Sequence, residues 1–302
     1  MDKKTKFGLL GLLIFLGLVI SFVYLNHVNI PVLEPQGIVA QKQLKLILLT
    51  LGLSAVVVIP VFALTITIGI KYREGNHKST YKPNWDGNNL LEIIWWLIPA
   101  ALILILGMVI WKSSYALDPY KPLSNTQKPI VIDVIALDWK WLFLYPEENI
   151  ATVNYLQIPV GRPIHFNITA DAPMNSLWIP QLGSQIYAMP GMSTELNLDA
   201  KRTGNYYGSS ANISGTGYAG MNFITHATPS SDYARWVKDT QRNKNELDSV
   251  TYAKLAKPSQ NNPPSFYGSY NEGLYDSIIM KYMGPMTHSQ HSAHTGHTEM
   301  MQ

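Results

Sequence analysis

The sequence predicts a membrane-embedded α-helical N-terminal part followed by an all-β sandwich with short helices at its end. Two observations lead to this fold class. Three uninterrupted apolar runs, each long enough to cross a bilayer, lie within the first 112 positions. Beyond them, short segments in which apolar and polar residues alternate are separated by proline and glycine turns, which is typical of packed β-strands.

The composition of the 302 residues excludes several functional classes. The chain contains no cysteine, which rules out disulfides, thiolate metal sites and thiol catalysis. Its formal net charge is only +3, and no basic stripe with stacking aromatics accompanies that charge, so we expect no nucleic-acid partner. No catalytic triad, glycine-rich phosphate loop or paired-carboxylate site stands out. We therefore expect no catalysis within this chain alone.

The first apolar run, Phe7 to Leu25, follows three lysines and contains no charge over 19 residues. It can be read as a cleaved signal peptide or as a retained membrane anchor. Signal peptides usually have shorter apolar cores that end in small residues at a cleavage site, whereas this run ends in YLNHVNIP. We favour a retained anchor and assign residues 1–29 to it; cleavage is the open alternative.

Two further apolar runs predict a transmembrane helical hairpin within residues 30–112. Leu46 to Ile70 and Leu90 to Trp111 are each long enough to cross a hydrocarbon core of about 30 Å. Positive residues in short loops stay in the cytoplasm, so we place the loop between the runs inside and everything after Lys112 in the periplasm. The charged residues of this loop are Lys71, Arg73, Lys78 and Lys82, opposed by Glu74 and Asp86.

Residues 113–228 carry the strand pattern. Alternating stretches start at Pro129, Arg162 and Ser193, and proline or glycine turns separate them. A span of about 115 residues suits one Greek-key sandwich, whose two inner faces can be buried without a metal. We therefore expect a single β domain here.

A helical extension and a tail are predicted beyond the sandwich. Within residues 229–285 we expect two helices, one in SSDYARWVKDTQRNK, which starts with capping residues, and one from Leu274 to Met283. The proline-rich stretch PSQNNPPS reads as a linker between them. Residues 286–302 repeat histidine at every third position from His288 to His297 and are rich in methionine. A disordered, solubilising tail is expected there, with transient metal binding as the alternative.

The stretch Gly208 to Met221, GSSANISGTGYAGM, resembles the binuclear copper loop of cytochrome c oxidase subunit II with its ligands removed. Another family ligand, a histidine, precedes a Ser-aromatic-Trp-(Val/Ile)-Pro segment that reads NSLWIP here, with Asn175 in the ligand place. Such a centre needs bridging thiolates and terminal imidazoles. We therefore expect no copper in this chain. The family pattern C-x-E-x-C-x-x-x-H-x-x-M falls on Ser210, Asn212, Ser214, Tyr218 and Met221, of which Met221 alone is retained.

Subunit II of the bo-type quinol oxidases lacks these ligands in the same way, and NSLWIPQLGSQIYAMPGM followed by SGTGYAGM is similar to its sequence. This resemblance, over roughly residues 31 to 285, implies a cupredoxin-like sandwich in the periplasm. It also implies a non-redox subunit of a proton-translocating quinol oxidase in a bacterial inner membrane. Haems, copper and the quinol site would belong to a catalytic subunit I, with further membrane subunits as partners. Ubiquinol is the expected substrate of the complex, with menaquinol left open.

Glu92 lies two residues into the last apolar run. An acid at that depth needs either water or a partner. From the residues alone, it reads as an interfacial carboxylate that reaches back to the cytoplasm. Subunit II of the haem-copper oxidases has a glutamate in the same E-x-x-W-W/T-x-x-P setting, at the mouth of a proton-uptake path into subunit I. The resemblance therefore implies that Glu92 collects protons.

Trp139 and Trp141 resemble the aromatic stretch through which cytochrome c passes electrons to copper in cytochrome oxidases. Here the acceptor behind them is missing. Tryptophans that alternate at strand spacing usually pack in a core. We therefore expect a structural role for both.

Three polar residues, Asp171, Gln181 and Asn197, could be the remnant of a cytochrome-binding surface. A docking face of that kind needs an acidic cluster, and Asp and Glu are sparse through this domain. We therefore expect no cytochrome c partner. His165 and His226 stand alone in the sequence and are expected as ordinary polar positions.

Two other functions compete with the quinol oxidase reading. A true cytochrome c oxidase subunit would need two cysteines and two histidines at the positions named above, and this sequence has none of them. A membrane-tethered, cupredoxin-like periplasmic metal carrier that uses the His and Met tail is the second alternative. It predicts a protein that is stable without any oxidase partner. The haem types of the complex stay open.

Overall fold

The computed structural model describes residues 30–73, 76, 86–124 and 127–283, together with Leu16, Gly17 and Ile20. Apart from those three positions, the expected N-terminal anchor lies outside the described residues. The His and Met tail and most of the charged loop between the two apolar runs lie outside them as well.

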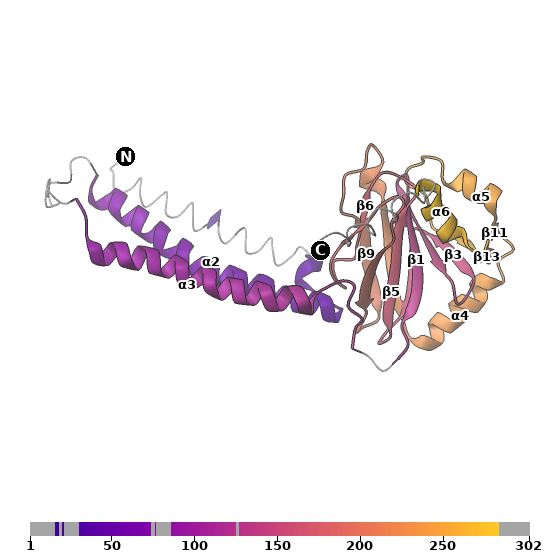
Figure 1. Ribbon diagram of the computed structural model, residues 1–302, viewed down its shortest axis with the longest axis horizontal. Helices are drawn as coiled ribbons and strands as arrows, with labels where there is room; N and C mark the ends of the chain where they lie inside the picture. The colour runs from indigo at the N-terminus through magenta and orange to yellow at the C-terminus, as the bar shows by residue number, and fades with distance from the viewer. Residues whose placement is uncertain are drawn as a thin grey trace, which may run out of the picture.

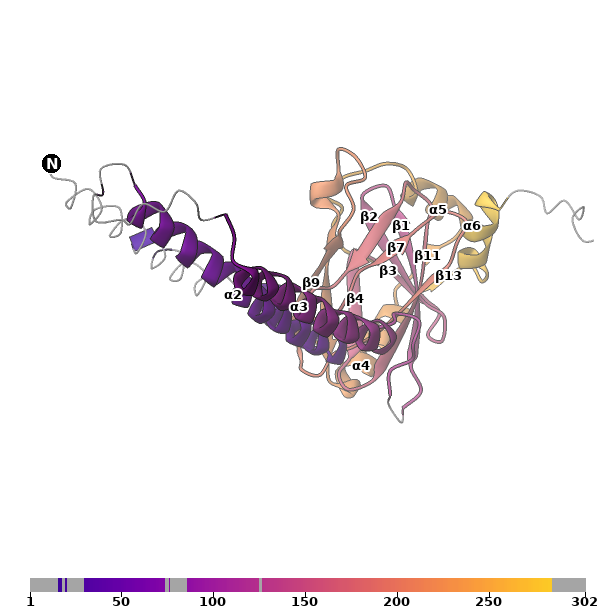
Figure 2. The same ribbon diagram turned by 60° about the vertical axis from the view of Figure 1, so that its left-hand side comes forward.

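A long antiparallel hairpin of two helices projects from one side of a β domain (Figures 1 and 2). After the short 3-10 helix η1 (Pro31–Leu33), α2 runs over Ile38–Lys71 and α3 over Asn89–Ala116. Both are long and apolar enough to cross a membrane, and their most apolar windows are not buried inside the protein. The predicted hairpin is confirmed, and both helices extend beyond their apolar runs at the end that meets the β domain.

Caps fix the starts of both helices, where backbone N–H groups have no partner within the helix. Asn88 caps α3, because its side-chain oxygen accepts from the amides of Leu90 and Leu91 at 3.0 and 3.2 Å. At the start of α2, the Ile38 amide donates to Asp199 of the β domain at 2.7 Å. A Cβ on Gly37 would lie 2.6 Å from two backbone oxygens, so this close approach requires glycine. The second cap fastens the hairpin to the sandwich.

Two sheets form the sandwich, a six-stranded one in the order β12-β3-β2-β1-β5-β8 and a five-stranded one in the order β4-β10-β9-β6-β7. Strand β1 pairs antiparallel with β2 and parallel with β5, and β10 pairs parallel with β4. The strands of the main domain are β1 (Ile130–Leu137), β2 (Lys140–Tyr145), β3 (Ile150–Val153), β4 (Tyr155–Pro159), β5 (Pro163–Ala170), β6 (Asn175–Trp178), β7 (Ile186–Ala188), β8 (Thr194–Asp199), β9 (Gly204–Ser210) and β10 (Asn222–Thr228).

The space between the sheets is filled by large side chains with almost no exposure. Trp141 and Phe143 of β2 both pack edge-on against Phe223 of β10, with ring centroids 6.1 and 5.0 Å apart. Phe166 of β5 is fully buried in the same core. Burying each such side chain stabilises the fold by roughly 1.5–3 kcal/mol.

A second core covers the outer face of β1, β2 and β3, at the end of the molecule away from the hairpin (Figures 1 and 2). There Ile135, Leu142 and Leu144 pack against Leu274 and Ile278. Strands β1 and β2 are therefore buried on both faces, which explains their nearly continuous apolar sequence. The covering elements are β11 (Glu246–Leu247), α5 (Ser249–Leu255), β12 (Ser265–Tyr267), β13 (Ser269–Tyr270) and α6 (Leu274–Tyr282). Helix α4 (Ser230–Gln241) instead packs Tyr233 and Val237 into the first core.

The C-terminal segment differs from its sequence-based description in three respects. It contains three short strands besides its helices, and β12 joins the main sheet by pairing with β3. A helix not expected from the sequence, α5, is capped by Asp248, whose side chain accepts from the Thr251 amide at 2.7 Å. The capping expectation for α4 is wrong, because among the described contacts at Pro229 no side chain caps this helix.

Candidate functional site

The loop with the oxidase resemblance connects β9 to β10, through the 3-10 helix η2 (Tyr218–Gly220), and lies beside the start of β6. Asn175 opens β6 and Ser210 closes β9, and both are almost fully buried. The pairing of β6 with β9 brings these two residues together although they are 35 positions apart in sequence. The structure thus gathers part of the predicted ligand set at one end of the five-stranded sheet.

Hydrogen bonds among these side chains use the polar groups that stand in the ligand positions. The Ser210 hydroxyl is a donor with two acceptors within reach: Asn175 Oδ1 at 2.9 Å and the Asn212 carbonyl oxygen at 3.1 Å. Asn175 Nδ2 donates to the Pro173 carbonyl at 2.7 Å, and Asn212 Nδ2 donates to the Met174 carbonyl at 2.9 Å. Buried polar groups need such partners. This part of the loop is therefore closed by neutral hydrogen bonds.

The remaining proposed ligand positions are Met221, Tyr218 and Ser214. Met221 is 1% exposed and belongs to the sandwich core, and its carbonyl accepts from the Ser210 amide at 3.1 Å. Tyr218 is half-buried at the start of η2. The Ser214 hydroxyl is buried and has no hydrogen-bond partner among the described residues.

These groups do not fit a copper centre. Hydroxyl, amide and phenol oxygens are poor ligands for Cu(I) beside thiolate and imidazole. Within residues 30–73, 86–124 and 127–283, no group of three or more His, Asp or Glu side chains is placed to hold a metal ion. No electron-transfer step through this loop follows from its residues.

Trp139 holds the loop from the opposite sheet. It was expected to lie on one strand with Trp141, and that expectation is wrong. Trp139 lies in the turn between β1 and β2 at a φ of 60°, whereas Trp141 is fully buried in β2. The indole of Trp139 donates to the Ser214 carbonyl at 3.3 Å, and a Cβ on Gly217 would lie 2.3 Å from its Cδ2. Both tryptophans therefore pack, as the sequence indicated, but in different ways.

Glu92 lies in the first turn of α3, and its side chain is exposed. Its amide donates to the Asn88 carbonyl at 3.0 Å, which fixes its place on the helix. Open grooves of about 490 and 310 Å³ flank it. Trp96 lines both of them. The carboxylate is therefore open to water or to a partner protein at one end of the hairpin.

Comparison with known proteins agrees with this architecture. The family model described as "Cytochrome C oxidase subunit II, transmembrane domain" matches residues 37–112, and the one for the periplasmic domain matches residues 111–228. A third, "COX Aromatic Rich Motif", matches residues 241–286. Among solved structures, the periplasmic domain of subunit II of cytochrome oxidase from Bradyrhizobium japonicum is 22% identical, with a TM-score of 0.36 over 38% of this chain and 96% of that chain.

Curated relatives cover nearly the whole chain. "Cytochrome bo(3) ubiquinol oxidase subunit 2" of Pseudomonas putida is 44% identical over 94% of this chain and 89% of its own length. "Ubiquinol oxidase subunit 2" of Acetobacter aceti is 43% identical over 90% and 89%, and "Quinol oxidase subunit 2" of Bacillus cereus is 40% identical over 85% and 89%. The chain belongs to the quinol oxidase subunit 2 family.

Membership of the quinol oxidase subunit 2 family confirms the predicted family, the fold class and the localisation. The fold is a pair of apolar helices followed by a cupredoxin-like β domain with short C-terminal helices. The hairpin lies in the bacterial inner membrane and the β domain in the periplasm. As a subunit 2, the chain is part of an oxidase complex of the haem-copper class.

In this subunit 2, the residues considered as a cytochrome-binding remnant are structural. Asp171 is only 7% exposed and accepts three hydrogen bonds of 2.6 Å each, from Tyr252, Lys281 and Tyr282. Burial alone would raise the pKa of the Asp171 carboxyl, but these donors outweigh it and lower the pKa. Gln181 acts through its backbone, because its carbonyl accepts from the Gln36 amide at 2.7 Å. Asp171 thus fastens the aromatic-rich segment to the sandwich.

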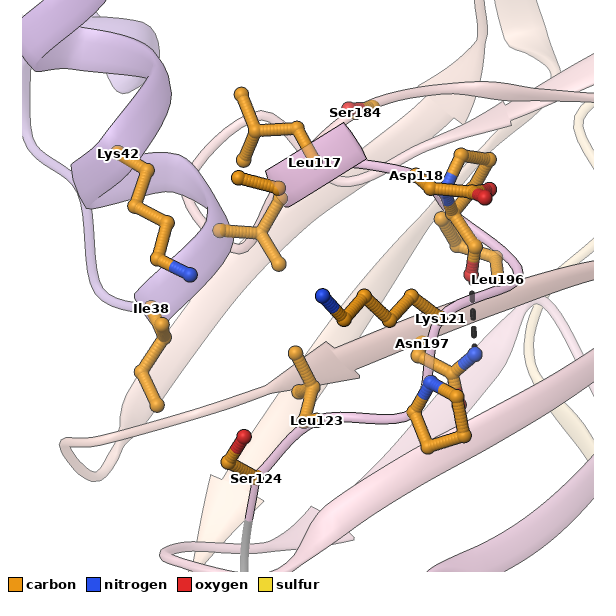
Figure 3. Close-up of a pocket in the computed structure, with 14 residues that line it drawn as sticks. Ile38, Lys42, Leu117, Asp118, Lys121, Leu123, Ser124, Ser184, Leu196 and Asn197 are labelled. Atoms are coloured by element: carbon orange, nitrogen blue, oxygen red, sulfur yellow. Dashed lines mark hydrogen bonds between the residues drawn. The ribbon is translucent and has the colours of Figure 1, made fainter. Parts of the chain in front are cut away.

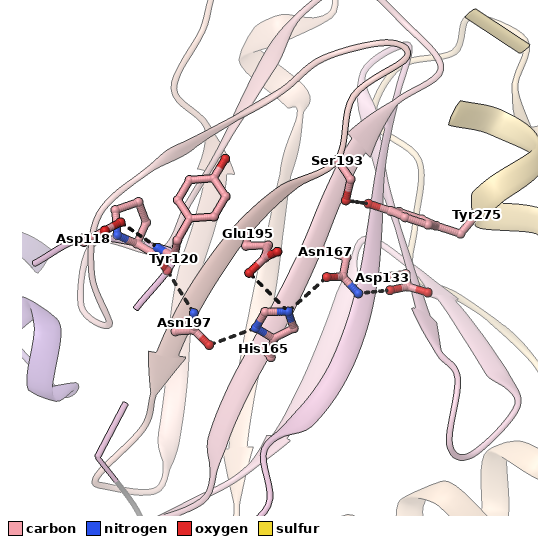
Figure 4. Close-up of polar contacts among 10 residues, drawn as sticks. Asp118, Tyr120, Asp133, His165, Asn167, Ser193, Glu195, Asn197 and Tyr275 are labelled. Carbon is pink, nitrogen blue, oxygen red and sulfur yellow. Dashed lines mark hydrogen bonds and ion pairs between the residues drawn. The ribbon is translucent and has the colours of Figure 1, made fainter. Parts of the chain in front are cut away.

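Asn197 belongs to a row of polar contacts across β1, β5 and β8 (Figure 4). Its side chain donates to the Pro119 carbonyl at 3.0 Å, and its oxygen lies 3.0 Å from His165 Nδ1. His165 Nε2 lies 3.1 Å from Asn167 Oδ1, and Asn167 Nδ2 donates to Asp133 at 2.7 Å. Both ring nitrogens face amide oxygens, and Nε2 also lies 3.8 Å from Glu195 Oε2. The row ties the segment after α3 to the sheet.

Sequence reasoning missed two residues with clear structural roles. Asp171 was considered only as a surface group, and Lys140 was not considered at all. The Lys140 side chain lies under the proline-rich stretch, where its ammonium donates to the Lys257 carbonyl and the Ser259 hydroxyl, each at 2.7 Å. Burial lowers its pKa. The only sequence signal for Lys140 is its position between two aromatic residues in a strand, which is too weak to identify such a contact.

Proposed function

We propose that this chain is the non-redox subunit 2 of a proton-translocating quinol oxidase, which couples oxidation of quinol to reduction of oxygen to water. One observation supports this above all: in the loop where cytochrome c oxidases hold copper, Ser210 and Asn175 form a buried hydrogen bond instead. Quinol delivers its electrons within the membrane, so a periplasmic copper relay is unnecessary. Relatives named ubiquinol oxidase subunit 2 make ubiquinol the expected substrate of the complex.

The partners in this proposal are a catalytic subunit I, which would hold the haems, the active-site copper and the quinol site, and further membrane subunits. The chain would support subunit I through the exposed apolar faces of α2 and α3. An affinity tag on this chain and extraction in mild detergent test the proposal. We expect bound haem in the optical spectrum and ubiquinol-driven oxygen consumption. A haem-free monomer that remains stable would contradict the proposal and favour the metal-carrier alternative.

We further propose that Asn175, Ser210, Asn212, Ser214 and Tyr218 occupy lost copper-ligand positions, with Met221 retained. The test restores the ligands by Asn175→His, Ser210→Cys, Asn212→Glu, Ser214→Cys and Tyr218→His in residues 112–285, which leaves out the histidine-rich tail. After addition of Cu(II), we expect a coloured copper centre in the variant and none in the wild-type domain. A folded variant that stays colourless would contradict the assignment.

Glu92 is proposed as a proton-collecting group at the cytoplasmic entrance of an uptake path into subunit I. Its exposed side chain at the end of α3, flanked by two grooves, supports access from water. We expect Glu92→Gln to leave assembly and haem content normal while slowing turnover, because it removes the ionisable group. Glu92→Asp should be impaired less. Oxygen consumption by the Gln variant that equals wild type across a range of pH would contradict this role.

A further inference from the structure

A cavity of about 170 Å³ lies where the membrane hairpin meets the sandwich (Figure 3). It is enclosed by the start of α2, the segment that follows α3, and strand β8. Its lining combines apolar side chains with two lysines. Those that matter here are Ile38, Lys42, Leu117, Lys121, Leu123 and Leu196.

The two lysines give this junction cavity a positive charge. Lys42 and Lys121 come from opposite walls, and both ammonium groups point into the space between them (Figure 3). Within the part of the chain that the structure describes, neither ammonium group has a hydrogen bond or an ion pair. Two unpaired cations that converge on one cavity favour an anionic ligand.

The nearest carboxylates are committed elsewhere. Asp118 accepts from the Tyr120 amide at 3.0 Å, and its side chain points away from the two ammonium groups (Figure 3). Asp199 caps α2 through the Ile38 amide, and burial raises the pKa of its carboxyl, against the lowering effect of the charges on Lys201 and, more weakly, Lys42. Lys42 therefore feels the Asp199 charge without forming an ion pair with it, and Asp199 does not line the cavity.

The cavity lies at the membrane surface. The transmembrane helix α2 begins at Ile38 and α3 ends at Ala116, and both residues line the cavity, so the cavity lies at the periplasmic end of the hairpin. Trp111 and Tyr115 pack edge to face in the last turns of α3, with ring centroids 5.6 Å apart. Such aromatic pairs sit at the level of lipid headgroups. The cavity is therefore within reach of phospholipid phosphate.

We propose that the junction cavity binds the phosphodiester headgroup of an anionic phospholipid from the periplasmic leaflet. Ammonium groups bind phosphate as compact charges, and basic pockets beside transmembrane helices bind anionic headgroups. The volume is below the roughly 300 Å³ of pockets that enclose a whole drug-sized ligand, so it suits a headgroup whose acyl chains remain in the membrane. Leu117 and Leu123 offer apolar contact to the glycerol end. A bound headgroup would join α2 to the segment after α3 and so stiffen the link between hairpin and sandwich.

The test uses the full chain, delipidated in neutral detergent and examined by native mass spectrometry with phosphatidylglycerol, phosphatidylcholine or inorganic phosphate added. We expect one phosphatidylglycerol to be retained in preference to phosphatidylcholine. Lys42→Gln with Lys121→Gln should lose about thirtyfold in affinity, since each lysine near a lipid surface contributes roughly one kcal/mol. Lys42→Arg with Lys121→Arg should retain binding.

A matched control removes the same amount of charge from the same end of the hairpin. Lys45 of α2 and Lys112 of α3 are exposed and do not line the cavity. The pair Lys45→Gln and Lys112→Gln should change affinity less than twofold. Equal losses in both Gln pairs would overturn the proposal, because they would indicate attraction by surface charge alone. Inorganic phosphate that displaces the lipid at equal concentration would also overturn it, because the site would then bind free phosphate.

Discussion

The membrane hairpin and the periplasmic sandwich differ most in where their apolar side chains lie. In β2 and β3 every residue is buried. Ala40 is the one buried residue that the structure describes in α2, and α3 over residues 89–116 has none. The sandwich therefore contains its own core, whereas the hairpin presents its apolar surface to lipid and to partner subunits.

Because of this difference, we expect the sandwich to determine stability and the hairpin to carry the functional contacts. In the sandwich, even the loop that resembles a copper site is occupied by internal hydrogen bonds and packing around Ser210 and Trp139. In the hairpin, Glu92 and the lysines of the junction cavity remain exposed. Substitutions in the sandwich should therefore act on stability, and substitutions in the hairpin should act on contacts and turnover.

The largest effect is expected from a cavity in the sandwich core. Phe166→Ala should lower the free energy of unfolding by about 3–5 kcal/mol, because Phe166 is fully buried. Leu104→Ala in α3 is the matched control, since Leu104 is 69% exposed, and it should cost less than about 0.5 kcal/mol. Urea unfolding of the full chain in detergent, followed by tryptophan fluorescence, measures both. Equal losses of unfolding free energy in the two variants would contradict the contrast between a buried sandwich core and an exposed hairpin.

The second-largest loss of stability is expected when Asp171 can no longer hold the C-terminal segment. Asp171→Asn removes the charge that holds Tyr252, Lys281 and Tyr282, and should cost about 2–3 kcal/mol. Because the folded-state pKa of Asp171 is lowered, its contribution is fully present above the unfolded pKa of about 3.9 and is lost as pH falls through the folded value. Stability of the wild type should therefore fall toward that of the variant below about pH 4.

Asp239→Asn provides the control for the Asp171 anchor. Asp239 pairs with Arg242 on the exposed surface of α4, and removal of such a pair should cost less than about 0.5 kcal/mol. Unfolding midpoints measured from pH 3 to pH 7 would compare the two variants. A constant difference between the Asp171 variant and wild type over that whole range would contradict the role of the charge.

The smallest stability effect is expected at two glycines. Gly217→Ala places a methyl group 2.3 Å from Trp139 Cδ2, and should cost about 1–3 kcal/mol because a large, half-buried side chain packed against the core must shift. Gly107→Ala in α3 meets nothing within 4 Å and should be neutral or stabilising by up to about 1 kcal/mol. Thermal unfolding monitored by near-UV circular dichroism tests the pair. A destabilised Gly107 variant would show that α3 packs more tightly than described.

The sequence predicted the parts of this fold whose signal is local. Hydropathy located both membrane helices, although α2 begins eight residues before its apolar run and α3 ends five residues after its own. Alternation located the stretches that form β1, β2, β5 and β8. It did not reveal that the segment around Ser265 returns to pair with β3, or that Asp171 meets Lys281, because these partners lie more than a hundred residues apart. It also missed the turn at Trp139, where a positive φ interrupts an apolar run that otherwise reads as one strand.

The candidate site was predictable to a different degree at each residue. The proposed ligand positions in the loop came from its resemblance to the copper loop of cytochrome c oxidase subunit II, whose pattern fixes the order of the ligands. Their new partners did not follow from spacing, because a hydrogen bond such as that between Ser210 and Asn175 depends on how two strands meet in space. Glu92 was singled out because a carboxylate at the edge of an apolar run is expensive to keep there. Its proton-collecting role came from the family resemblance and stays a prediction.

The most direct test of the contrast between hairpin and sandwich measures ubiquinol-driven oxygen consumption per haem in two complexes. Both are purified by an affinity tag on this chain. One carries Glu92→Gln and the other carries Ser210→Ala, which removes a hydroxyl that hydrogen-bonds in the loop that resembles a copper site. Glu92→Gln should slow turnover severalfold at normal haem content. Ser210→Ala should lower the unfolding midpoint slightly and leave turnover unchanged. Turnover that falls with Ser210→Ala and not with Glu92→Gln would contradict a functional role for Glu92 and a structural one for Ser210.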